Sequence, residues 1–265
     1  MTDLAGNPHI LLPDWDAPAQ IGALVSLRTG GVSLPPYSSL NLGDHVGDEP
    51  AHVQLNRERL AQWAGLAPEN LQWLRQVHGI EVVEAAPERG SREADAVTSR
   101  QPGVGCIVMT ADCLPVFFCD ASGQQVAVAH AGWRGLLNGV LEATLAKFEN
   151  PSTVLAWLGP AIGPDSFEVG EEVRDAFLAS DPNHASCFQP AWGQSGFGQP
   201  ENLQEKQPQK WLADLYALAR QRLNRHGLHQ ISGGTACTFR EADKYFSYRR
   251  DGRTGRMASL IWIRR

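Results

Sequence analysis

The fold is decided by the stretch Met109-Thr110-Ala111-Asp112-Cys113-Leu114-Pro115, which an apolar segment joins to His130-Ala131-Gly132-Trp133-Arg134-Gly135. Apolar runs at 104–109, 116–119 and 126–129 surround the two motifs. Such runs, when Gly, Pro and Asp bound them, are typical of buried strands. The pattern therefore places Cys113 and His130 near strand ends, where loops present reactive groups on a rigid sheet. A helix is expected over 136–148, and backbone N–H groups at its start would attract anions.

Apolar patterns elsewhere predict further strands and a few helices. We expect strands at 23–27, 71–74, 80–84, 154–158 and 258–263, and helices at 49–64, 169–178 and 211–225. The polar segment 181–207 is expected to be a loop excursion rather than a domain boundary, because only one helix and a short tail follow it. Strands and helices in this proportion favour a layered α/β or α+β fold, with a single domain spanning residues 1–265.

The composition excludes several functional classes. The chain has 265 residues and a net charge of −6, which disfavours binding to nucleic acid or to an anionic membrane. No apolar run approaches the roughly 20 residues of a membrane span, and no signal peptide is expected at the N-terminus. The five cysteines are an odd number and include no Cys-x-x-Cys pair, so reduced thiols are expected. We expect a cytoplasmic protein.

Three residues, taken together, suggest either a metal site or a catalytic site: His78, Cys113 and His130. Imidazole and thiolate groups are ligands of zinc and copper, and three protein ligands with an open fourth position are typical of a catalytic zinc. Zinc lowers the pKa of a bound water to about 7. Alternatively, Cys113 is a nucleophile and His130 its base, oriented by Asp112 or Asn41. Each residue also has a purely structural interpretation, such as a buried apolar thiol. Spacing alone does not separate these alternatives.

Two polar segments are candidates for binding an anion such as phosphate. Arg28 opens a glycine-rich loop, and the next loop carries Asn41 and His45. With the segment 132–135, these residues could hold phosphate. Ordinary turn chemistry explains the same Asn, Asp and Gly residues equally well. The tail segment 245–252 is rich in Arg and Tyr, which suits either a solvated face or an anion-binding edge.

The ordered motifs resemble those of the YfiH-like family, also called the laccase-domain or multicopper polyphenol oxidase-like family. The likeness covers nearly the whole chain. It rests on Arg28–Ser33, Asn41–Gly43, His45, Gly47–Asp48, Arg75–Gly79, Ala94–Ala96, Thr110–Pro115, His130–Gly135, Leu158–Gly163 and Ser247–Gly252.

This resemblance implies a four-layer αββα sandwich and a zinc ion held by His78, Cys113 and His130. It also implies a purine nucleoside enzyme that phosphorolyses adenosine, inosine and 5'-methylthioadenosine and deaminates adenosine. Family members are also described as copper-dependent polyphenol oxidases and as enzymes that edit peptidoglycan precursors. A related toxin family with a Cys-His pair keeps a hydrolase as an alternative. The oxidase interpretation fits poorly, because one Cys and two His cannot hold the several coppers of such a site.

The expected roles of individual residues follow from the motifs and the resemblance together. Catalytic roles are expected for Cys113, His130 and Asp112, with Asp112 moving protons. Substrate contacts are expected from Arg28, Asn41, His45, Gln76, Trp133 and Arg134. The expected cofactor is Zn2+, with Cu2+ as an alternative occupant in vitro. The expected partners are a small-molecule nucleoside and phosphate, and a homodimer is one option for the assembly.

Overall fold

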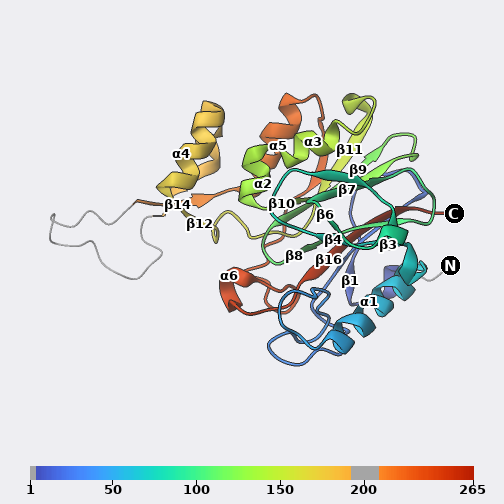
Figure 1. Cartoon of the computed structure of the whole chain (residues 1–265). Helices are drawn as coiled ribbons and strands as arrows, with labels where there is room; N and C mark the ends of the chain where they lie inside the picture. Colours follow the sequence, from blue (N-terminus) through green and yellow to red (C-terminus); the bar gives the residue numbers. More distant parts are fainter. Residues whose placement is uncertain (1–3, 192–208) are drawn as a thin grey trace.

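The computed structural model describes residues 4–191 and 209–265, in which two β-sheets pack face to face (Figure 1). One sheet has the order β1 (Ile10–Leu11), β2 (Ile21–Ser26), β16 (Met257–Ile263), β8 (Gly105–Thr110) and β3 (Leu71–Gln72). The other has the order β15 (Gln230–Gly233), β11 (Val154–Leu158), β9 (Leu114–Asp120), β10 (Val126–Ala131), β7 (Ala96–Ser99) and β5 (Val82–Glu84). We call them the five-stranded and the six-stranded sheet.

Both faces of the central strands are buried. In β8, Cys106 and Val108 point into the core between the sheets, whereas Ile107 points to the opposite face. In β9, Phe117 likewise faces the inter-sheet core and Phe118 faces away from it. Strands that are covered on both sides need apolar residues at every position, which explains the continuous apolar runs in the sequence.

Helices cover the two outer faces. Helix α1 (Pro50–Ala64) packs on the five-stranded sheet through a cluster that includes Leu60 and Ile107. Helices α2 (Trp133–Asn138), α3 (Val140–Leu145) and α5 (Leu215–Arg225) cover the six-stranded sheet (Figure 1). The order of layers is therefore helix, sheet, sheet, helix, and the predicted mixed α/β sandwich is confirmed.

The prediction of one helix over 136–148 is wrong. Helix α2 begins earlier, at Trp133, and α3 follows after Gly139 and ends at Leu145. Gly139 has a φ of 104°, a left-handed conformation that interrupts the helix. The helix that starts beside His130 therefore has only six residues, so it offers less of a helix dipole than the sequence suggested.

A small three-stranded sheet lies beside the sandwich, in the order β12 (Glu168–Gly170), β14 (Lys210–Ala213) and β13 (Phe188–Pro190), next to α4 (Glu171–Ser180) (Figure 1). The helix predicted from Trp211 begins only at Leu215, because 210–213 pair with two strands and Asp214 caps the helix by accepting from the Ala217 N–H. Of the excursion predicted over 181–207, residues 192–207 lie outside the described residues.

The remaining elements are short. Strands β4 (Leu74–Arg75) and β6 (Arg92–Glu93) pair with each other, and α6 (Tyr248–Asp251) forms one turn in the tail. The predicted strand 71–74 is thus divided between β3 and β4. Short 3-10 helices span Leu4–Gly6, Pro68–Asn70, Pro87–Arg89, Pro151–Thr153 and Pro182–Cys187. None of the helices in 4–191 and 209–265 combines the length and apolarity that crossing a bilayer requires.

Candidate metal centre

The fold brings His78, Cys113 and His130 together, although 52 positions separate the two histidines. One ligand atom from each residue lies within 4.8 Å of the other two. The Cys113 Sγ atom is 3.8 Å from His78 Nε2, and the two imidazole rings meet edge to face. His130 is buried, Cys113 is half-buried and His78 is exposed. The cluster is therefore open to solvent on the side of His78.

The crossing between the two sheets places the thiol. Strand β8 belongs to the five-stranded sheet and β9 to the six-stranded sheet, so residues 111–113 form the link between them. Within this link Asp112 has a φ of 97°, which side-chain-bearing residues rarely adopt. His130 pairs with Pro115 across β9 and β10, which brings the imidazole beside the link. Cys113 is thus held between the sheets by a tight turn.

One buried carboxylate, that of Asp95, organises both histidines. It accepts hydrogen bonds from the backbone N–H groups of the turn 77–79, at 3.2, 2.9 and 2.6 Å. His78 in this turn has a φ of 61°. Asp95 also accepts from His130 Nδ1 at 2.8 Å, which leaves His130 Nε2 free to act as a ligand. Carboxylates in this position orient metal-binding histidines and raise their basicity.

The lack of a side chain at Gly132 makes room for two side chains of the cluster. A Cβ atom at this position would lie 2.7 Å from His78 Cδ2 and 3.0 Å from Cys113 Sγ. Both distances are shorter than van der Waals contact. Any larger residue would therefore displace two of the three candidate ligands.

The charges of the cluster favour the ligand form of the thiol. Burial raises the pKa of Cys113, but the adjacent His130 and His78 lower it by more, so the net pKa lies below that of an ordinary thiol. Burial lowers the pKa of His130, whereas Cys113 and Asp95 raise it by more. Thiolate binds metals and thiol does not. Two imidazoles and one thiolate with an open fourth position fit a metal ion that takes nitrogen and sulfur ligands.

Asp112 ties the cluster to the tail of the chain. Its buried carboxylate accepts from the Thr238 hydroxyl at 2.7 Å and from the Arg249 backbone N–H at 2.7 Å. Its carbonyl accepts from the Ile162 N–H. The expected catalytic carboxylate therefore lies beside Cys113 and is held from two directions.

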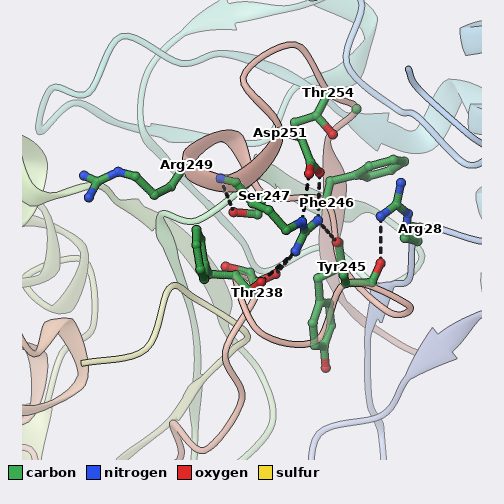
Figure 2. Close-up of polar contacts among 12 residues, drawn as sticks. Arg28, Thr238, Tyr245, Phe246, Ser247, Arg249, Asp251 and Thr254 are labelled. Carbon is green, nitrogen blue, oxygen red and sulfur yellow. Dashed lines mark hydrogen bonds and ion pairs between the residues drawn. The ribbon is translucent and has the colours of Figure 1, made fainter. Parts of the chain in front are cut away.

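Arg28 contacts the tail rather than the cluster in the part of the chain that the structure describes. Its Nη1 donates to the Ala242 carbonyl at 2.7 Å, and its guanidinium lies 5.0 Å from the centre of the Phe246 ring. Figure 2 shows Arg28 beside the tail residues that surround Tyr245 and Asp251. The substrate contact expected of Arg28 stays a prediction, and its visible role is to fasten the tail to the end of β2.

Two further predicted substrate residues have structural partners. Asn41 is fully buried: it accepts from the Gly43 and Arg256 N–H groups and donates to the Gly43 carbonyl and Asp48. Both of its donors and both of its acceptor positions are used. Gln76 donates to the Met109 carbonyl at 2.8 Å and accepts from its N–H at 2.7 Å, which holds the His78 turn against β8.

The other three predicted substrate residues lie nearer solvent. His45 is exposed, with Nδ1 3.4 Å from Asp44. Trp133 and Arg134 begin α2, directly after Gly132, and the Arg134 guanidinium lies 4.4 Å from the centre of the Trp133 ring. Trp133 is also packed partly against the core, whereas Arg134 is exposed. The substrate contacts expected of these three residues stay predictions.

Arg256 is a candidate that the sequence did not single out. Met257 pairs with Thr110 across β16 and β8, so Arg256, one residue earlier, reaches the level of the link 111–113. Burial lowers the pKa of Arg256, and the charges of Cys113 and Asp112 act in the opposite direction. The signal that could have revealed it is the register of the last strand, which no local pattern fixes.

Known proteins are similar to this chain over most of its length. The model of a family described as multi-copper polyphenol oxidoreductase laccase matches residues 22–264. Purine nucleoside phosphorylase YfiH of Escherichia coli is 53% identical over 256 residues, which cover 96% of this chain and 98% of the relative. A purine nucleoside phosphorylase of Pseudomonas aeruginosa is 52% identical over 254 residues, with coverage of 96% and 98%.

Solved structures share the fold. A Neisseria meningitidis protein superposes with a TM-score of 0.87 at 49% identity, over 97% of this chain and 100% of that one. YlmD of Geobacillus stearothermophilus superposes with a TM-score of 0.80 at 31% identity, over 93% of each chain.

Proposed function

We propose that the chain, which belongs to the family described as multi-copper polyphenol oxidoreductase laccase, is a zinc-dependent purine nucleoside phosphorylase. Its proposed substrates are adenosine, inosine and 5'-methylthioadenosine, and adenosine deamination is proposed as a second activity. Relatives that are 53% and 52% identical carry the name purine nucleoside phosphorylase and support the reaction class.

The observation that carries the proposal is the cluster of His78, Cys113 and His130, which Asp95 orders from behind. Zinc bound there would supply a Lewis acid with an open position. The exposure of His78 gives a small molecule access to that position. We assign the three residues as the zinc ligands.

In phosphorolysis, a phosphate oxygen forms a bond to the anomeric carbon of ribose while the bond from that carbon to the base nitrogen breaks. The leaving base needs a proton, and the phosphate needs a positive group to hold it. Asp112 is the carboxyl group that we assign to proton transfer, because it lies next to Cys113 in the same link. Trp133, Arg134 and His45 are proposed to meet the nucleoside at the open side of the cluster.

A product analysis tests this function. Purified protein is incubated with adenosine, inosine or 5'-methylthioadenosine, with and without phosphate, and the products are separated by chromatography. We expect free base and ribose 1-phosphate, or its methylthio form, only when phosphate is present, and ammonia from adenosine in either case. Free ribose at the same rate without phosphate would show a hydrolase instead. Untouched nucleosides would reject the proposal.

A second candidate function is a Cys-His hydrolase that edits peptidoglycan precursors. This function is favoured by the pairing of Cys113 with His130, because each residue stabilises the charged form of the other. It predicts that the protein releases an amino acid from a muramyl peptide and leaves adenosine untouched. The copper-dependent polyphenol oxidase has less support, because among the described residues one three-residue group with metal-binding geometry is found and several coppers need more ligands.

A further inference from the structure

We propose that Arg256 binds the phosphate nucleophile through the Nε and Nη2 edge of its guanidinium. The inference rests on the proposed phosphorylase activity and identifies a cation for its second substrate. The sequence favoured the glycine-rich loop, the Asn41 loop and the start of α2 as the phosphate site, and Arg256 lies outside all three.

Strand register places Arg256 at the cluster. The antiparallel pairs Met257 with Thr110 and Ala258 with Met109 run toward the link 111–113. Arg256 continues this direction, and its charge interacts with Cys113 and Asp112. An anion held by this guanidinium would therefore lie beside the candidate metal ligands.

The stem of Arg256 is fixed by the loop that contains Asn41. The Arg256 N–H donates to Asn41 Oδ1 at 2.9 Å, and its carbonyl accepts from the Leu42 N–H. A Cβ atom at Gly43 would lie 2.8 Å from Arg256 Cγ, so this glycine gives the stem its place. The motif Asn41-Leu42-Gly43 thus positions Arg256 and does not itself offer an acceptor or donor from Asn41.

In the Arg256 guanidinium, Nη1 donates hydrogen bonds to the protein, whereas, within the described residues, the edge formed by Nε and Nη2 does not. Its Nη1 donates to the Thr254 and Gly255 carbonyls at 3.0 and 3.1 Å. Among the residues that the structure describes, Arg256 makes no ion pair, and its Nε and Nη2 have no protein acceptor. Arg57 differs, because its Nη2 is paired with Asp44 at 3.2 Å.

A half-buried guanidinium with a free two-nitrogen edge suits phosphate. The fork of two parallel N–H donors matches two phosphate oxygens, and charge-assisted bonds of this kind are about twice as strong as neutral ones. The bonds of Nη1 hold the plane in advance, so little conformational freedom is lost when the anion binds. The centre of the Tyr248 ring lies 5.9 Å from the guanidinium carbon, and Tyr248 itself is 61% exposed.

The first test measures the KM for phosphate in the zinc-loaded enzyme. We expect R256Q to raise it by about 30-fold or more, since two charge-assisted bonds are lost, while the KM for inosine changes by less than about two-fold. R256K keeps the charge and the stem but not the fork, and we expect an intermediate increase. G43A keeps the guanidinium but displaces its stem, and should also raise the KM for phosphate.

Two other arginines make the test specific. R240Q removes an exposed guanidinium that pairs with Asp165 and not with any residue of the cluster, and should leave both KM values unchanged. R28Q removes the cation that the sequence favoured. An increase in the KM for phosphate in R28Q, with none in R256Q, would overturn the proposal, as would equal increases for phosphate and inosine in R256Q.

A binding experiment separates this inference from the proposed function. Inorganic phosphate alone is titrated into zinc-loaded wild type, R256Q and R256K and followed by 31P NMR, with far-UV circular dichroism to confirm that each is folded. We expect binding to wild type and weakening by about 30-fold or more in R256Q. This result would support the phosphate site even if wild type failed to cleave nucleosides. Phosphate binding of equal strength to wild type and R256Q, or no binding to wild type, would overturn it.

Discussion

Gly132 lies closer to the candidate metal ligands than any residue with a side chain could. Its missing Cβ is what allows His78 and Cys113 to approach the backbone at the start of α2. The sequence places Gly132 two residues after His130, but only the folded chain shows that His78, from a distant turn, lies against it.

The substitution G132A should therefore displace two ligands at once. A methyl group would stand 2.7 Å from His78 Cδ2 and 3.0 Å from Cys113 Sγ. We expect the zinc affinity to fall by at least about ten-fold, the range seen when ligand orientation is lost. G163A is the matched control, because its methyl group would meet the Sγ of Cys237, which is not part of the cluster, at 3.0 Å. Equal zinc affinity in G132A and wild type would contradict this role.

The thiol of Cys113 should react at unusually low pH once metal is removed. Its pKa is lowered by the neighbouring histidines, so the thiolate persists as the pH falls below the usual thiol pKa of about 8.5 and is lost only at lower pH. Alkylation of metal-free protein with iodoacetamide, followed by mass spectrometry, should give a midpoint for Cys113 well below 8.5. Cys106 and Cys119 serve as internal controls, since both are fully buried and should stay unmodified while the protein is folded. A midpoint at or above 8.5 for Cys113 would contradict the electrostatic account.

At the scale of elements, the turn 77–79 has its shape because Asp95 gathers its N–H groups. The same carboxylate holds His130 in β10, so one residue sets the separation between two ligands from different elements. The segment 94–96 is one of the sequence motifs. Its hydrogen-bond partners, the turn 77–79 and His130, lie in two other segments, and spacing along the chain does not predict these contacts.

We expect D95N to weaken zinc binding by about 10- to 100-fold, as for other carboxylates behind a metal-binding histidine. The amide presents one acceptor oxygen and an NH2 group that can only donate, where Asp95 now accepts four hydrogen bonds, so the free energy of unfolding should also fall by about 1–3 kcal/mol. D181N is the matched control, because Asp181 accepts from the Asn183 N–H at a 3-10 turn away from the cluster. Equilibrium urea unfolding and zinc competition give the two quantities. A loss of stability without any loss of zinc affinity would show that Asp95 serves the fold alone.

Element boundaries followed from the sequence where local physics decides them. The strand 154–158 was predicted with the bounds it has, because an apolar run between polar segments has one simple interpretation. The helix over 136–148 was wrong because a single glycine conformation divides it. The helix predicted over 211–225 is wrong at 211–213, because these residues belong to β14 and its partners, β12 and β13, are non-local.

At the scale of the whole molecule, the site lies where the chain passes from the five-stranded sheet to the six-stranded sheet. The core between the sheets and the cores under the helices consist of apolar side chains that do not include the cluster. The layered arrangement was predictable from the resemblance and the strand patterns. The position of Arg256 was not, because it depends on how the last strand pairs with β8.

A core that does not depend on the cluster should survive metal removal. After chelation, we expect the far-UV circular dichroism spectrum at 25 °C to be unchanged. With free zinc 100-fold above its Kd, binding adds about 2.7 kcal/mol of stability, so its removal should lower the Tm by roughly 5–10 °C. Loss of the folded spectrum on chelation would instead make the metal structural.

The most direct test of the account is a titration of zinc into metal-free protein, with the rate of ribose 1-phosphate formation from inosine and phosphate measured at each step. A site built from His78, Cys113 and His130 predicts a rate that rises linearly and levels off at one zinc per chain. Full activity before zinc is added, or a rate that ignores zinc while the metal binds, would contradict the central claim.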